Sequence, residues 1–259
     1  MNSLVNTTCL EDLVNPEKGF FLFKGFLTQE QVDDYRLECE SLFHTVPQVA
    51  KWPGYGEGRV NRDDMYDYVN PKLDKKGQVA YWRLFQFMQN PHSPETEKIF
   101  DKALSLRNHI EKHWLYDLEY KKNKESLGDY VQTTHHVEDG RGLAKHTDFK
   151  GILTFPLLQC VILLSRPDHD FRGGELLVYT KSGRCVQIHS ELKMDKGDAL
   201  FFDKSLFHEV KPTYHVPSNT VGRWSAIIGA RYGLPTKQHS LFGRVLKKPI
   251  RMLKKLLGK

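Results

Sequence analysis

The sequence predicts a mainly β protein with flanking helices, whose core is a double-stranded β-helix (a jelly roll of the cupin-like kind). From about residue 129 onwards, short runs rich in β-branched and aromatic residues alternate with Gly, Asp and Pro turns. Their near-regular spacing is typical of a β-sandwich or barrel. The gaps are too short for crossover helices, so the strands should pair antiparallel. Eight such runs cover residues 129–137, 145–149, 158–165, 174–180, 185–189, 199–203, 208–214 and 223–232.

The chain before this core is expected to be mostly helical. Thr28 is placed to cap a helix over residues 29–43. A Pro opens a second helical stretch over residues 94–115. Between them, residues 51–71 are rich in Gly, Tyr, Asp and Arg, which predicts a long loop.

Composition indicates one ordinary globular domain. The 259 residues are 39% hydrophobic and 27% charged, which excludes disordered and low-complexity classes. We expect a single domain over residues 1–240, with its helical part over about 1–128 and its jelly-roll core over about 129–235. The four cysteines form no CxxC pair, and the N-terminus lacks a signal-peptide pattern, so a cytoplasmic location is expected.

The positive charge belongs to the C-terminal tail, residues 241–259. These nineteen residues hold seven Lys or Arg and no acidic residue, and the rest of the chain has 31 basic against 32 acidic residues. A nearly neutral body argues against a nucleic-acid partner. The tail is amphipathic and interrupted by Pro249. Two interpretations stay open: a helix docked on the domain, or peripheral contact with an anionic membrane at its inner face.

A candidate metal site begins with an HxD triplet, His146 and Asp148. Residues at i and i+2 point to the same face of a strand, so both side chains can converge on one ion. A third ligand must come from elsewhere, and His208 lies at the edge of a later predicted strand. Two His and one carboxylate form the facial triad of non-haem Fe(II) oxygenases.

Four segments in order extend this pattern. They are YVQTTHHVEDGRGLAKHTD (130–148), FRGGELLVY (171–179), KGDALFFDKSLFHEV (196–210) and GRWS (222–225). Together they resemble the Fe(II)- and 2-oxoglutarate-dependent dioxygenases, especially the prolyl-4-hydroxylase-like branch. The resemblance implies that catalytic His146, Asp148 and His208 bind iron. It also implies 2-oxoglutarate and O2 as cosubstrates, with ascorbate as a candidate stimulant.

The same resemblance assigns the distal carboxylate of 2-oxoglutarate to Arg223 and Ser225. A guanidinium offers a planar, permanently charged fork, and Ser225 at i+2 shares its strand face. One departure is the spacing, because fourteen residues separate His208 from Arg223, somewhat more than the family usually shows. Arg231 is therefore the rival anchor.

Three functions follow from this resemblance. The first is hydroxylation of an unactivated C–H of a small molecule or glycoconjugate, with release of succinate and CO2. The second is hydroxylation of a peptide or protein, of the prolyl type, which would need an open groove. The third is a non-catalytic, metal-binding jelly roll. Fold analogy alone does not choose the substrate.

Overall fold

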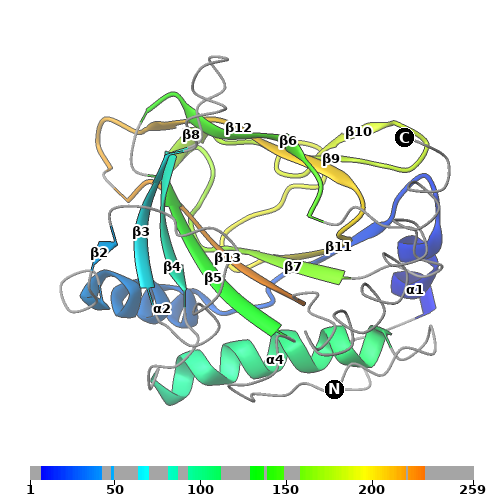
Figure 1. Cartoon of the computed structure of the whole chain (residues 1–259), viewed down its shortest axis with the longest axis horizontal. Coiled ribbons are helices and arrows are strands. Elements are labelled where there is room, and N and C mark those ends of the chain that lie inside the picture. The colour runs from blue at the N-terminus through cyan, green and yellow to red at the C-terminus, as the bar shows by residue number, and fades with distance from the viewer. Residues whose placement is uncertain are drawn as a thin grey trace, which may run out of the picture.

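A computed structural model gives the fold of the chain (Figure 1). It describes residues 7–42, 48–49, 64–69, 81–86, 93–111, 129–136, 139–148, 158–219 and 221–230. The predicted tail, residues 241–259, and the rival anchor Arg231 lie outside these residues.

Helices occur only in the first half of the described chain. They are α1 (Thr7–Val14), α2 (Gln29–Leu42) and α4 (Pro94–Glu111). The first strands are β1 (Phe20–Phe23), β2 (Gln48–Val49), β3 (Asp64–Val69), β4 (Tyr81–Gln86), β5 (Asp129–His136), β6 (Arg141–His146) and β7 (Leu158–Leu163). The later strands are β8 (Phe171–Gly173), β9 (Leu176–Tyr179), β10 (Cys185–Gln187), β11 (Ala199–Asp203), β12 (Phe207–His215) and β13 (Arg223–Ala230).

The strands form two facing sheets, which confirms the predicted jelly roll. The larger sheet has the order β1-β11-β7-β13-β5-β4-β3-β2, and the smaller one has the order β10-β9-β12-β6 with β8 attached to β12. All pairings among the core strands β5–β13 are antiparallel, as predicted. Figure 1 shows α2 and α4 against the face of the larger sheet that points away from the smaller sheet.

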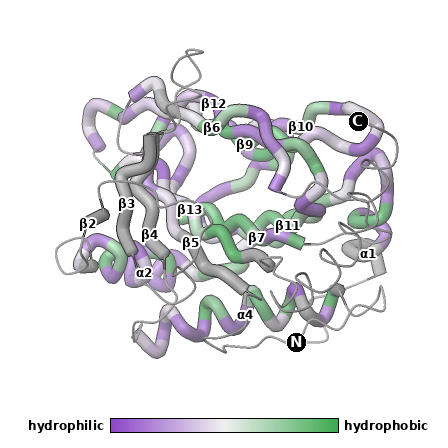
Figure 2. The backbone as a smooth tube through the Cα atoms, viewed as in Figure 1, coloured by the Kyte–Doolittle hydropathy of each residue, from purple (hydrophilic) through white to green (hydrophobic). Residues whose placement is uncertain are grey.

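Side-chain alternation in the central strands separates two apolar cores. In β13, Trp224, Ala226 and Ile228 pack with the helices, whereas Ile227 packs between the two sheets. β7 follows the same rule, with Cys160 and Ile162 toward the helices and Val161 and Leu163 toward the sheet interior. Figure 2 shows these two strands among the most hydrophobic parts of the backbone. Because successive side chains point to opposite faces, Arg223 and Ser225 must face the interior between the sheets.

The described residues before residue 129 form strands as well as the predicted helices. They add β1, β2, β3 and β4 to the larger sheet. The predicted loop over residues 51–71 is wrong in part, because β3 (Asp64–Val69) pairs along its whole length with β4. The alternating polar and apolar residues of DMYDYV fit a strand at least as well as a loop.

The start of α2 confirms the predicted cap. The Gln31 backbone N–H donates to Thr28 Oγ1 at 3.2 Å, and the Thr28 N–H donates to Gln31 Oε1 at 3.0 Å. This reciprocal capping box satisfies donors that a helix start otherwise leaves unpaired. The helix can therefore begin at Gln29 and bury Val32, Tyr35 and Cys39 against the larger sheet.

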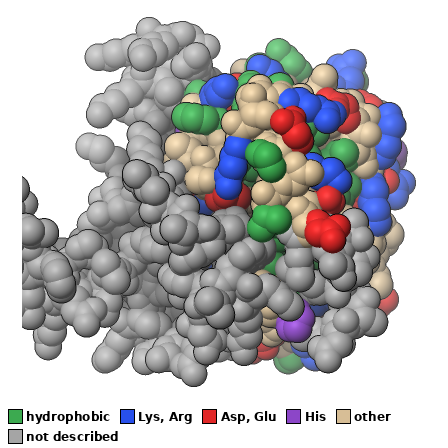
Figure 3. All heavy atoms as spheres, turned by 90° about the vertical axis from the view of Figure 1, so that its right-hand side faces the viewer, with side chains coloured by type: hydrophobic (Ala, Val, Ile, Leu, Met, Phe, Trp, Pro, Cys, Tyr) green, Lys and Arg blue, Asp and Glu red, His purple; other side chains and the backbone are tan. Residues whose placement is uncertain are grey.

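The surface drawn in Figure 3 carries both signs of charge, with basic and acidic side chains interspersed. Ion pairs of the described residues include Lys18–Asp12 at 2.6 Å and Arg184–Glu191 at 3.1 Å. Mixed charges screen one another and build no single-sign field on that face. None of the helices in the described ranges is both long and apolar enough to cross a membrane.

Candidate metal centre and cosubstrate pocket

The structure brings together the three residues of the predicted triad. His146 ends β6, and it lies directly opposite His208 in the β6–β12 pairing. Their ring centroids are 4.2 Å apart. Asp148 joins them from the chain just after β6, with one carboxylate oxygen 3.6 Å from His146 Nε2 and the other 3.6 Å from His208 Nε2. One ligand atom from each residue lies within 4.8 Å of the others.

Asp148 reaches this cluster by a different route from the one predicted. The HxD argument placed both residues within one strand, but β6 ends at His146. Thr147 donates through Oγ1 to the Lys204 backbone carbonyl at 2.9 Å, which ties the segment after β6 to the turn before β12. The carboxylate is therefore positioned by this turn rather than by strand alternation.

Both imidazoles present the same nitrogen to the cluster. His146 Nδ1 lies 2.8 Å from the Ala144 carbonyl, and His208 Nδ1 lies 3.1 Å from the Leu206 carbonyl. A carbonyl oxygen can only accept, so each Nδ1 carries a hydrogen, and in the neutral ring Nε2 keeps its lone pair. This backbone support is the arrangement that orients metal-binding histidines. The donor set therefore fits a divalent iron.

The charges in the cluster also suit a cation. Burial and the neighbouring His146 lower the pKa of His208 to about 4, although Asp148 opposes this, so its ring is neutral at physiological pH. Burial raises the pKa of Asp148, but His146, His208 and Lys204 outweigh it and bring it far below the usual range. For His146, burial lowers the pKa, yet Asp148 reverses the shift and the net pKa is raised. Asp148 and His208 thus already have the protonation states that metal binding requires.

Arg223 and Ser225 lie together in the interior, as predicted. Both are 2% exposed. Arg223 donates through Nε to the Gly174 carbonyl at 3.1 Å and through Nη1 to Ser225 Oγ at 3.3 Å. Burial lowers the pKa of Arg223 to about 10, opposed by Glu175, so the guanidinium remains charged at neutral pH. A buried cation beside a hydroxyl can hold a carboxylate.

Gly174 allows the close approach of the Arg223 side chain. A Cβ on Gly174 would lie 2.8 Å from Arg223 Cδ and 3.0 Å from Phe171 Cε2. The residue also has φ +59°, a conformation that L side chains rarely adopt. Glycine is therefore required here by both space and backbone conformation.

Two further residues of this pocket were not predicted as site residues. Thr134 on β5 shares a 2.8 Å hydrogen bond with Ser225 Oγ, through its own Oγ1. His189 is 8% exposed, and burial and Arg223 lower its pKa to about 3. Single Thr and His residues in ordinary turn or strand sequences carry no signal for such a position.

The fold and the donor set are those of a known class of protein. A jelly roll with two His and one carboxylate is the pattern of the non-haem Fe(II) oxygenases. The comparison with protein families is more specific. Residues 131–228 match the family model described as the 2OG-Fe(II) oxygenase superfamily. The jelly-roll segment of the chain is therefore similar to the 2OG-Fe(II) oxygenases, and this similarity indicates a dioxygenase. The family implies Fe(II) as the bound metal, with 2-oxoglutarate and O2 as cosubstrates.

Solved structures confirm the fold at low sequence identity. A prolyl-4-hydroxylase from Pseudomonas putida is similar with a TM-score of 0.58 and 15% identity, over 87% of this chain and 98% of that one. A Trichoplax adhaerens prolyl hydroxylase, in complex with a hypoxia inducible factor peptide, is similar with a TM-score of 0.53 and 14% identity, over 86% of each chain. The carbocyclase SnoK from nogalamycin biosynthesis is similar with a TM-score of 0.51 and 12% identity, over 92% of this chain and 91% of that one. No curated protein sequence matches the chain significantly.

Proposed function

We propose that the protein is a dioxygenase that hydroxylates an unactivated C–H of a small molecule or glycoconjugate. The observation that carries this proposal is the cluster of His146, Asp148 and His208, in which both Nε2 lone pairs and a carboxylate converge. In this proposal the three residues bind Fe(II) on one face and leave the remaining positions for the cosubstrates. The bound iron, with 2-oxoglutarate and O2, supplies an oxidation that yields succinate, CO2 and hydroxylated product.

The chain's own residues would hold and orient the cosubstrate. Arg223 and Ser225 would bind the distal carboxylate of 2-oxoglutarate, the guanidinium through its charge and the hydroxyl through a hydrogen bond. Thr134 supports Ser225 from the neighbouring strand. Apolar side chains between the sheets, among them Val178 and Phe202 beside His208, would exclude water from the metal cluster.

The substrate is proposed from features outside the metal cluster. The amphipathic basic tail, residues 241–259, would suit a substrate held at an anionic membrane, such as a lipid-linked sugar. A peptide substrate is the alternative, and it draws on the prolyl hydroxylases of the same fold. SnoK, titled a carbocyclase from nogalamycin biosynthesis, represents other chemistry on this scaffold. At these identities the neighbours support the fold, and the choice belongs to experiment.

Metal and cosubstrate binding are tested together under anaerobic conditions. Fe(II) and then 2-oxoglutarate are added to the purified protein, and the weak visible charge-transfer band of the chelate is recorded. We expect His146→Ala to abolish the band and Arg223→Ala to weaken it. His215→Ala, which replaces a histidine outside the cluster, is the matched control and should leave the band intact. A folded, iron-loaded wild type without the band would refute the 2-oxoglutarate proposal and favour a non-catalytic jelly roll.

Substrate class is then tested by succinate release. A panel of small molecules and glycoconjugates is compared with prolyl-containing peptides, each measured against the turnover without substrate. Stimulation by the first group supports the proposal. Stimulation by peptides alone would replace it with the alternative. Adding ascorbate to the same assay shows whether it stimulates.

A further inference from the structure

The connection from β12 to β13 is held by polar contacts made outside the sheets. It makes up part of the enlarged spacing between His208 and Arg223, since β12 itself extends to His215. Arg223 is the first residue of β13, where it pairs with His136 of β5. On the other side the ladder with β7 begins at Ser225, and Trp224 is bonded there to the Leu164 N–H at 3.0 Å and to Ser165 Oγ at 2.8 Å. The residues just before Arg223 are held by further contacts of their own.

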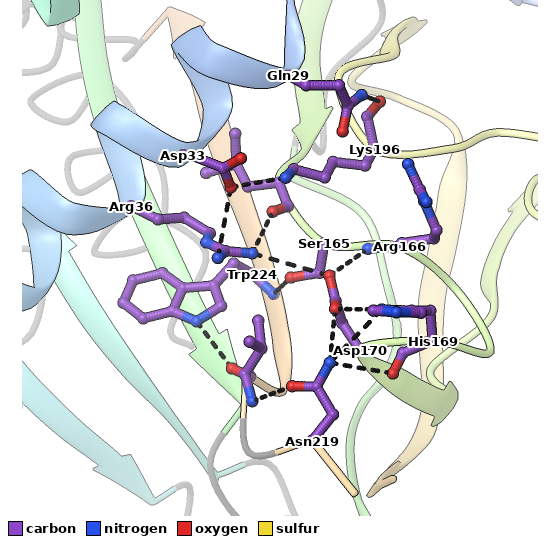
Figure 4. Close-up of polar contacts among 12 residues, drawn as sticks. Gln29, Asp33, Arg36, Ser165, Arg166, His169, Asp170, Lys196, Asn219 and Trp224 are labelled. Atoms are coloured by element: carbon purple, nitrogen blue, oxygen red, sulfur yellow. Dashed lines mark hydrogen bonds and ion pairs between the residues drawn. The ribbon is translucent and has the colours of Figure 1, made fainter.

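Asp170 is the centre of these contacts (Figure 4). Its side chain is 5% exposed and lies between β7 and β8 in the sequence. Oδ2 accepts from the Arg166 backbone N–H at 2.8 Å, and Oδ1 accepts from His169 Nδ1 at 2.9 Å and from Asn219 Nδ2 at 3.0 Å. Every one of these partners is a donor, so the site requires two acceptor oxygens.

Asn219 carries the contact into the β12–β13 connection. Its amide also donates to the His169 carbonyl at 3.2 Å, and its Oδ1 accepts from the Val221 N–H at 2.9 Å. One residue further on, the Gly222 N–H donates to the Asp170 carbonyl at 3.2 Å. The residues immediately before Arg223 are thus bonded twice to the segment 169–170, directly and through Asn219.

The α2 helix supports the same contacts from the outer face of the larger sheet. Arg36 Nη1 lies 3.7 Å from Asp170 Oδ2 and donates to the Leu164 carbonyl at 3.4 Å. Asp33 accepts from Lys196 Nζ at 2.6 Å and lies 3.5 Å from Arg36. Figure 4 shows Arg36 directed from α2 toward Asp170, with Asp33 of the same helix directed toward Lys196. Burial raises the pKa of Asp170, but the hydrogen bonds from the Arg166 N–H and His169, together with the charge of Arg36, outweigh it and leave the pKa lowered.

We propose that Asp170 and Asn219 form a clasp that positions Arg223 to bind 2-oxoglutarate. The inference rests on the function proposed above for Arg223. Neither residue would touch the cosubstrate, so both are positioning residues. A carboxylate anchor must be held in a fixed geometry, because small misplacements of a binding group are costly. The clasp adds to the bonds of the sheet by fixing the residues immediately before Arg223.

The test is calorimetric titration of 2-oxoglutarate into the iron-loaded, anaerobic protein. In Asp170→Asn one acceptor oxygen becomes an NH2 group that faces donors, so we expect the Kd for 2-oxoglutarate to rise about tenfold. Asn219→Ala, which alters a less buried side chain, should raise the Kd in the same direction. The affinity for Fe(II), titrated separately, should not change, because His146, Asp148 and His208 lie outside the clasp.

Asp139→Asn is the matched control. Asp139 also accepts hydrogen bonds near the start of this connection, from His215 N at 2.6 Å and Nδ1 at 2.8 Å, and it makes no hydrogen bond to Asn219, Val221 or Gly222. The Asp139→Asn protein should bind 2-oxoglutarate with the same Kd as the wild type. Unchanged Kd values in folded Asp170→Asn and Asn219→Ala would overturn the clasp while the proposed function stands. An equal rise in the control would also overturn it, and wild-type protein that binds no 2-oxoglutarate would refute the function and the clasp together.

Discussion

Gly174→Ala tests the packing on which the Arg223 pocket depends. The new methyl group would lie 2.8 Å from Arg223 Cδ, 2.9 Å from Thr213 Oγ1 and 3.0 Å from Phe171 Cε2. All three neighbours are buried, so none can move freely into solvent. Overpacking of this kind costs about 1–3 kcal/mol. The left-handed backbone of residue 174, at φ +59°, adds about 1–2 kcal/mol for any residue with a Cβ.

The two costs can be separated with Gly25→Ala. Gly25 has the same φ of +59°, but a Cβ there would meet nothing within 4 Å. Its substitution should therefore lower the free energy of unfolding by only about 1–2 kcal/mol, against about 2–5 kcal/mol for Gly174→Ala. Urea denaturation of both variants and the wild type measures the difference. The affinity for 2-oxoglutarate should fall only in Gly174→Ala, because Arg223 must move.

Equal stability losses in the two variants would refute the packing argument, since they would leave backbone strain as the only cost. A Gly174→Ala protein that is destabilised but binds 2-oxoglutarate normally would refute the link between this glycine and the Arg223 side chain.

Three further predictions concern separate parts of the molecule. Arg223→Lys keeps the charge but loses the planar fork that reaches both Gly174 and Ser225, so calorimetry should show 2-oxoglutarate binding at least about tenfold weaker; near wild-type affinity would mean that charge alone suffices. Thr28→Ala removes the α2 cap and should lower the unfolding free energy by about 1 kcal/mol in urea, and a neutral result would contradict the capping box. Because the native pKa of Asp170 is lowered, its carboxylate stabilises the fold at pH values above its unfolded pKa of about 4, and this effect is lost as the pH falls through the native pKa. The difference in unfolding free energy between wild type and Asp170→Asn should therefore become smaller in acid. A difference that does not change with pH would argue against an ionised Asp170.

Strand alternation made much of the core and part of the site predictable. The run from Arg223 to Ile228 alternates between two apolar layers, so the interior position of Arg223 and Ser225 follows from period two. The same rule brought His146 and Asp148 together by an argument that does not hold in detail, because β6 ends between them. The triad still assembles, since the turn at Lys204 positions Asp148.

The remaining features depend on contacts between distant segments. β1 is a run of only four residues, FFLF, and short apolar runs do not separate strand from helix. The clasp of Asp170 and Asn219, with its supporting Arg36, joins residues from two connections and a helix. Each of these residue types is common in its kind of segment, and only the folded topology brings the three side chains together. Sequence periodicity indicates which residues share a face of one helix or strand, and it carries no information on contacts between distant segments.

The direct pairing of His146 with His208 has a consequence for the strand that carries His146. Among the described strands, β6 is the end strand of the smaller sheet, bonded in that sheet to β12 alone. In the proposed function, iron would join β6 to β12 through side chains as well as through the backbone, and so act as a cross-link between the two strands. Removing the metal would then leave the pairing of β6 with β12 to the backbone alone, so metal binding would stabilise this part of the smaller sheet as well as supply the chemistry.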